Sequence, residues 1–171
     1  QSMTPQQLQE VLLSSKYMET AYQKDLAAAV KAAEDDYRAT ATKIQAMDSQ
    51  QMQDFMSNLK GGQPDIQQYH QTLAAVVETM TPQEIQQVLA ASKTMDVPYQ
   101  KDLAKALKVS ELHHAKLAGQ VQQMNPQQLQ SFLNTIKTQN PELYPKKLQN
   151  IMQAMTPQQA QKVIAVSKDT D

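Results

Sequence analysis

The stretch MTPQQLQEVLLSSK, residues 3–16, returns four more times along the chain. Close copies, MTPQEIQQVLAASK and MTPQQAQKVIAVSK, begin at Met80 and Met155, and looser copies, MDSQQMQDFMSNLK and MNPQQLQSFLNTIK, begin at Met47 and Met124. Each copy places Thr, Asp or Asn after the methionine, Gln or Glu three residues later, and then apolar residues at helical spacing. The repeated phrase therefore predicts five helix starts.

Each predicted start has the form of a capping box, in which two side chains three positions apart each bond the other residue's backbone N–H. Proline follows the cap in four of the five copies, where its fixed φ suits the first helical position. The methionine before the cap is expected to pack on the first apolar residue of the helix. The predicted boxes are Thr4 with Gln7, Asp48 with Gln51, Thr81 with Glu84, Asn125 with Gln128, and Thr156 with Gln159.

The phrases belong to a longer duplication. A shift of 77 residues aligns 3–60 with 80–137 at 27 of 58 identical positions, and after a two-residue deletion Tyr69 aligns with Tyr144. We interpret 1–171 as a single helical-repeat domain in which residues 1–2 resemble the remnant of a purification tag. The copies span 3–79, 80–154 and, in part, 155–171.

The fold class predicted is all-α. Apolar spacing indicates long helices over 22–47 and 96–123, a shorter one over 48–60 that Gly61-Gly62 stops, and another from Ile66. The aligned helix in the second copy is expected to start at Pro145. About nine helices follow, as antiparallel hairpins stacked in a short α-solenoid or an elongated bundle.

Composition narrows the function classes. There is no Cys, so thiolate chemistry is excluded. The net charge is −1, which gives no electrostatic reason to expect nucleic acid, and no apolar run could span a membrane.

The two halves of the sequence differ in charge. Residues 1–79 carry 6 basic and 10 acidic groups, net −4, whereas residues 80–171 carry 10 basic and 7 acidic groups, net +3. This asymmetry indicates either drift between copies or head-to-tail self-association. A ratio of 15 Lys to one Arg hints at a bacterial source, and a secreted, periplasmic or cytoplasmic location stays open.

Candidates for catalytic or metal chemistry are few. Glu111 and His114, one helical turn apart, could supply two metal ligands, but a zinc site needs three or four. The carboxylates of 34–36 are predicted to form a solvated helix face, because consecutive helical side chains point apart. No nucleophile elbow or phosphate loop is present. We therefore predict no enzyme, metal or cofactor.

Two features are candidates for partner contacts. Glutamine pairs on one helical face could form a ladder of amides along an extended peptide, although capping and solubility explain them more simply: Gln6 with Gln9, Gln50 with Gln53, and Gln127 with Gln130. The string YQKDLA at 22–27 returns unchanged at 99–104, and its polar residues are expected to make two equivalent surface contacts: Gln23, Lys24, Asp25, Gln100, Lys101 and Asp102.

These observations predict a non-enzymatic helical-repeat module, an adaptor or scaffold that binds a protein or peptide. Stacked hairpins offer broad surfaces, and no catalytic constellation competes with this interpretation. The alternative is a protein that binds a lipid or another small apolar ligand between the two long helices.

Overall fold

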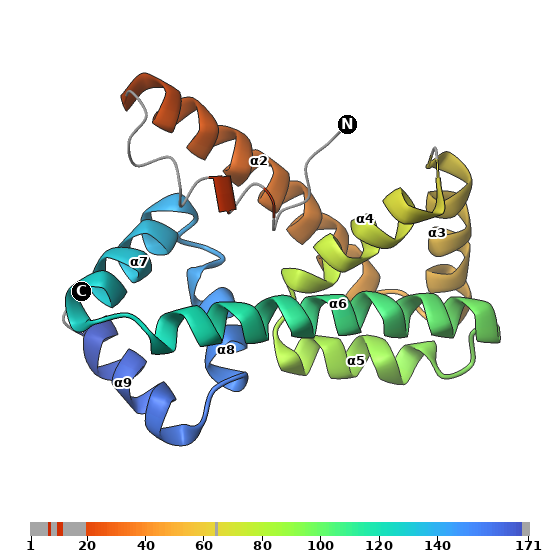
Figure 1. The fold of residues 1–171 in the computed structure, drawn as a ribbon. Coiled ribbons are helices and arrows are strands. Elements are labelled where there is room, and N and C mark those ends of the chain that lie inside the picture. Colours follow the sequence, from red (N-terminus) through yellow and green to blue (C-terminus); the bar gives the residue numbers. More distant parts are fainter. Residues whose placement is uncertain (1–6, 8–9, 12–19, 64, 169–171) are drawn as a thin grey trace. The chain divides into compact units, whose positions relative to one another are not determined.

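Helices make up most of the part that the structure, a computed structural model, describes: residues 7, 10, 11, 20–63 and 65–168. Eight helices have defined bounds and no strand occurs among these residues (Figure 1), which confirms the all-α prediction there. The helices are α2 (Thr20–Gln45), α3 (Ser49–Gly62), α4 (Ile66–Glu78), α5 (Pro82–Ser92), α6 (Val97–Gln122), α7 (Pro126–Gln139), α8 (Tyr144–Gln153) and α9 (Pro157–Lys168). A search of these helices finds none with the length and apolarity of a membrane span.

The two long helices lie where the apolar spacing predicts them. Helices α2 and α6 each span 26 residues. Helix α8 begins at Tyr144 and places Pro145 in its first turn, where the missing N–H has no partner to lose. The helix predicted over 3–16 lies outside the described residues apart from positions 7, 10 and 11, so the count of nine stays a prediction.

The end of α3 differs from the prediction that Gly61-Gly62 stops it. The helix includes both glycines, and neither adopts the positive φ of a left-handed C-cap. The cap residue Gln63 is extended, with φ −95° and ψ 143°. A proline follows it in the sequence, and a residue before proline is restricted to extended backbone. The proline therefore sets the end of the helix.

Helix starts follow the predicted capping code. At Asp48, Thr81 and Asn125 the cap side chain accepts the N–H of the third helical residue, whose own side chain accepts the N–H of the cap. Thr156 and Gln159 exchange the same two hydrogen bonds, at 2.9 and 3.3 Å. Four of the five predicted boxes are confirmed, and the box at Thr4 lies outside the described residues.

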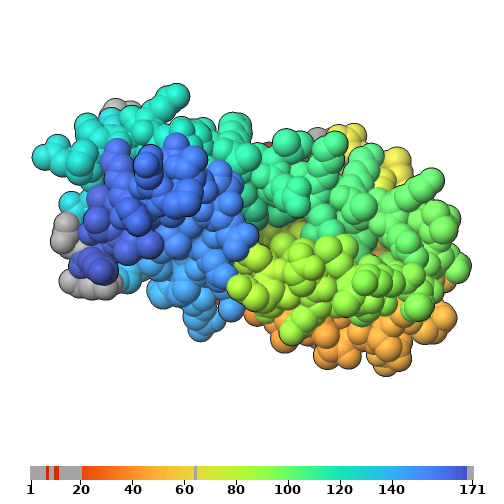
Figure 2. Space-filling view, turned by 90° about the horizontal axis from the view of Figure 1, so that it is seen from below, coloured from red at the N-terminus to blue at the C-terminus, as the bar shows by residue number. Residues whose placement is uncertain are grey.

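The chain divides into two compact units, residues 1–110 and 111–171, and the division falls inside α6. In the first unit α5 runs alongside the first half of α6, and the side chains of the two segments pack together (Figures 1 and 2). One apolar core joins all five helical segments of this unit, with contributions that include Ile44, Met56, Tyr69, Leu73, Val88, Leu103 and Ala106. Residues 80–110, from the second sequence copy, therefore complete the core of the first.

The second unit packs the end of α6 with α7, α8 and α9. Helix α9 contacts both α7 and α8. Asn140, fully buried, links α7 to α8, because its N–H donates to the carbonyl of Ile136 and its carbonyl accepts the N–H of Tyr144. The buried apolar side chains of this unit include Leu117, Val121, Leu129, Phe132, Leu133, Ile136, Leu143, Ile151 and Val163.

Candidate interaction surface

The start of α6 is held by Gln53 of α3, a residue that the sequence placed among the partner contacts. The side-chain carbonyl of Gln53 accepts the N–H of Asp96 at 2.8 Å, and its amide donates to the Asp96 carboxylate at 3.0 Å. The carbonyl of Asp96 in turn accepts the N–H groups of Tyr99 and Gln100. Because the first N–H groups of a helix lack partners within it, these bonds fix the residue at which α6 begins.

Asp102, further along α6, is held by Tyr69 and Lys60. The Tyr69 hydroxyl donates to its carboxylate at 3.0 Å, and Lys60 Nζ lies 4.0 Å from the same oxygen. Tyr69 has no exposed surface. Burial, together with the Asp102 carboxylate, raises the pKa of the Tyr69 hydroxyl. The hydroxyl therefore stays protonated at neutral pH and remains a donor to Asp102. We call Gln53, Lys60 and Tyr69 the α6 clamp.

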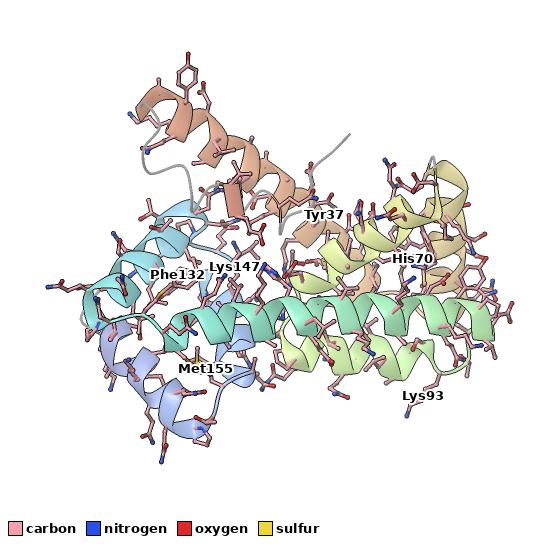
Figure 3. The ribbon with its side chains drawn as sticks, in the orientation of Figure 1. Tyr37, His70, Lys93, Phe132, Lys147 and Met155 are labelled. Atoms are coloured by element: carbon pink, nitrogen blue, oxygen red, sulfur yellow. The ribbon has the colours of Figure 1, made fainter. Side chains whose placement is uncertain are left out.

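Gln100 closes the turn between α5 and α6. Its side-chain amide donates to the carbonyls of Lys93, at 3.0 Å, and Met95, at 2.6 Å. Figure 3 labels Lys93 in this turn. Carbonyls that follow the end of a helix have no helical partner, so the bonds from Gln100 satisfy two of them.

The second YQKDLA string is therefore largely structural. Gln100 and Asp102 bond to residues of their own unit, and Leu103 is buried in its core. Asp102 has a structural role within its unit, because its carboxylate accepts a hydrogen bond from the hydroxyl of the buried Tyr69. Lys101 is exposed.

The first YQKDLA string has its Tyr, Lys and Asp side chains exposed to solvent. Tyr22 is 61% exposed, Lys24 and Asp25 are also exposed, and Gln23 is half-buried. The first turns of α2 extend beyond α3, α4 and α5 of the same unit (Figure 1). We call Tyr22, Asp25, Leu26, Ala29 and Ala33 the α2 face; every one is more exposed than its aligned residue on the α6 face, Tyr99, Asp102, Leu103, Ala106 and Ser110.

The predicted glutamine pairs have different surroundings in the two units. In the first, the Gln50 amide donates to Asp54 on its own helix at 3.0 Å, while Gln53 bonds Asp96. In the second, Gln127 and Gln130 are exposed. Gln6 and Gln9 lie outside the described residues. Gln53 thus contributes to the architecture, and Gln127 and Gln130 remain candidates for contact with a partner.

A junction between α2 and α5 was missed by sequence reasoning. Arg38 forms a bidentate pair with Glu84, with Nη1 to Oε1 at 3.0 Å and Nη2 to Oε2 at 2.8 Å, and Nη1 also donates to the carbonyl of Thr79. Burial alone would raise the pKa of Glu84, but hydrogen bonds from Arg38 and from the N–H of Thr81 lower it to about 2.

Two sequence features could have revealed this junction. Arg38 is the only arginine among 15 lysines, and arginine is the residue suited to bidentate carboxylate pairing. Glu84 is the only glutamate at a position where the other four phrases carry glutamine. Both residues therefore differ from the residues at their aligned positions, with alanine in the place of Arg38.

The possible metal and carboxylate sites gain no support. Among the residues with described positions, no group of three or more His, Asp or Glu side chains could hold a metal. Burial and the neighbouring His113 lower the pKa of His114 to about 4, so its ring is neutral at pH 7. The prediction of a solvated face over 34–36 is wrong for Glu34, which is 5% exposed. Since the three side chains point in different directions, one of them faces inward.

Removing the Gln53 side chain tests its role in starting α6. We expect Gln53→Ala to lower the free energy of unfolding by about 1 kcal/mol, the usual cost of losing a helix cap. The matched control is Gln130→Ala, at the aligned and exposed position of α7, which should cost under about 0.5 kcal/mol. Urea denaturation of both variants at a low protein concentration measures the difference, and equal losses would contradict the role assigned to Gln53.

Comparison with known proteins gives no relative: no family model, curated protein or solved structure matches the chain. The function is therefore argued from the geometry of the chain itself. Its most informative feature is one repeated helical string whose Tyr, Asp and Leu side chains are less exposed on α6 than on α2.

Proposed function

We propose that this chain is a non-enzymatic helical-repeat module that binds another protein or a peptide as an adaptor or scaffold. The exposure of the α2 face carries the proposal. Tyr22 stands in solvent beside the half-buried Leu26, and tyrosine is enriched among residues that anchor protein interfaces. The aligned residues of α6 pack against other helices. The chemistry of this face is therefore suited to a helical partner.

Helix lengths support the repeat part of the proposal. Helices α2 and α6 each have 26 residues, and α3 and α7 each have 14. Capping boxes also fall at aligned positions in the copies. One pair, at Asp48 and Asn125, precedes α3 and α7, and another, at Thr81 and Thr156, precedes α5 and α9. Duplicated hairpins that keep their lengths and starts are expected to present equivalent surfaces. Stacking as a short α-solenoid or elongated bundle stays a prediction.

The shifted pKa values also support a non-enzymatic role. Perturbed titratable groups often mark catalytic sites. Here the lowered pKa of Glu84 comes with a bond to Arg38, and the raised pKa of Tyr69 comes with a bond to Asp102. Each of these bonds joins two helices of the first unit. Burial and the contact with Asp102 therefore account for the shift of Tyr69, and the pair with Arg38 accounts for the lowered pKa of Glu84.

Photo-crosslinking tests the proposal. A photoreactive phenylalanine derivative at position 22, in cells that express the chain, should give a crosslinked product of defined mass. The same group at Lys105, which is exposed on α6, is the matched control and should give little product. If position 22 yields no more product than position 105, the α2 face is not a partner surface and the proposal fails.

A further inference from the structure

The residues that hold the start of α6 occur twice in the sequence. The α6 clamp of the first unit consists of Gln53, Lys60 and Tyr69. The aligned residues of the second unit are identical in type: Gln130, Lys137 and Tyr144. Of the two α6 residues that the clamp bonds, Asp102 is repeated as Asp25, whereas Asp96 aligns with Glu19. The α6 residues near Asp102 are repeated as well, Tyr99 as Tyr22 and Leu103 as Leu26. Most residues on both sides of one helix-to-helix contact are therefore encoded twice.

Within the first unit the contact is made once, and it buries both sides. Tyr69 is 0% and the neighbouring Leu73 2% exposed, and on the α6 face Leu103 is 4% and Ala106 1% exposed. The second set of residues is more exposed on each side, except at Lys137, which is half-buried where Lys60 is exposed. Tyr144 and Leu148 are only half-buried, Gln130 is exposed, and Ala29 of the α2 face is exposed. Apart from the lysine, the same residue types are thus less covered on both complementary surfaces.

We propose that the α2 face of one copy of this chain packs on the α7–α8 face of a second copy, the surface formed by Gln130, Lys137, Tyr144 and Leu148. This inference rests on the proposed function and names the partner. The intermolecular contact repeats the contact of α6 with α3 and α4, with Asp25 in the place of Asp102 and Leu26 in the place of Leu103. The half of the sequence that carries α2 has a net charge of −4 and the half that carries α7 and α8 has +3, which favours encounter in this orientation.

The geometry of the contact determines the kind of assembly. The two surfaces are different patches of the chain, so the contact is heterologous, and each copy that uses its α2 face still offers its α7–α8 face. Assembly therefore proceeds head to tail and ends only where the contacts close into a ring. Association should raise the average mass as the protein concentration increases.

Charge reversal combined with mixing tests the orientation. Asp25→Lys and Lys137→Asp should each weaken self-association of the purified full chain about tenfold or more, because each places like charges in the contact. Mixing the two variants should restore association, because both contacts between unlike variants carry opposite charges at positions 25 and 137. One contact keeps the unchanged pair of Asp25 and Lys137, and the other joins the two substituted positions with the signs exchanged. Sedimentation equilibrium over a range of concentrations measures both effects. The matched control is Lys105→Asp, the same charge change at an exposed position of α6, which should leave association unchanged.

Engineered cysteines identify the occupant directly, since the chain has no Cys of its own. Leu26→Cys mixed with Leu148→Cys should form a bismaleimide-linked dimer, whereas neither variant alone should do so. A monomeric wild-type chain at all concentrations, no rescue on mixing the charge variants, or linkage only within a doubly substituted chain would each overturn the proposal. A crosslink from position 22 to a different polypeptide, without self-association, would overturn this inference and leave the proposed function standing.

Discussion

Replacing Arg38 with methionine is expected to lower the free energy of unfolding by about 2–4 kcal/mol at neutral pH, because it leaves a half-buried carboxylate without its charge partner. Arg38 donates two hydrogen bonds to Glu84, which join α2 to α5, and one to the carbonyl of Thr79 at the end of α4. The side chains of Arg38 and Glu84 are only 22% and 17% exposed, so solvent screens their interaction weakly. Urea denaturation followed by circular dichroism measures the loss.

The same pair predicts a dependence on pH. The pKa of Glu84 is about 2 in the folded protein, against 4.5 for an unperturbed glutamate. A lowered folded pKa contributes stability above the unfolded value, and that stability is lost as the pH falls from about 4.5 toward 2. At about 1.4 kcal/mol per unit, the contribution is at most about 3 kcal/mol. Arg38→Met should lose less stability across this window than the unchanged chain does.

An exposed ion pair provides the control for Arg38. Lys31 and Asp35 form a salt bridge on α2 with side chains 45% and 43% exposed. Lys31→Met should cost under about 0.5 kcal/mol and leave the acid sensitivity unchanged, since exposed pairs contribute little. If Arg38→Met costs no more than Lys31→Met, or if the two variants lose stability equally between pH 4.5 and 2, the pair does not stabilise the α2–α5 junction.

The features that the sequence predicted are those encoded locally. A capping box joins residues three positions apart, so Thr81 and Glu84 can be recognised without knowing any other part of the fold. The length of α2 likewise follows from apolar spacing along one helix. The end of α3 was also local, but two glycines were given more weight than the proline after Gln63.

The features that were missed depend on residues far apart in the chain. Gln53 and Asp96 are separated by 43 positions, and Arg38 and Glu84 by 46. Nothing in the phrase that contains Gln53 distinguishes it from Gln130, because the two residues occupy the same position in a repeated motif. Which one bonds another helix depends on the segment that packs beside it. For the same reason, the identity of the two YQKDLA strings could not reveal that Leu103 is buried while Leu26 is only half-buried.

The Leu103→Ala substitution is expected to lower the free energy of unfolding by about 2–4 kcal/mol, because it opens a cavity in the core of the first unit. Leu103 is 4% exposed and belongs to the same apolar cluster as Tyr69 and Leu73. The Leu26→Ala substitution removes the same atoms from the same string and should cost under about 1 kcal/mol, because Leu26 is only half-buried. Urea denaturation at a low protein concentration, where the chain is monomeric, measures both losses.

Protein concentration separates the two leucines further. If the α2 face packs on a second copy, association stabilises the folded chain by mass action, and the unfolding midpoint rises with concentration. Leu26→Ala removes an apolar side chain from that contact, so the rise should be smaller than in the unchanged chain. Leu103→Ala weakens the core without altering the α2 face. The unfolding midpoint of this variant, although lower, should therefore rise with protein concentration as steeply as that of the unchanged chain. Equal losses for the two substitutions at low concentration would mean that Leu26 is buried within its own chain, and the α2 face would then not be a free surface.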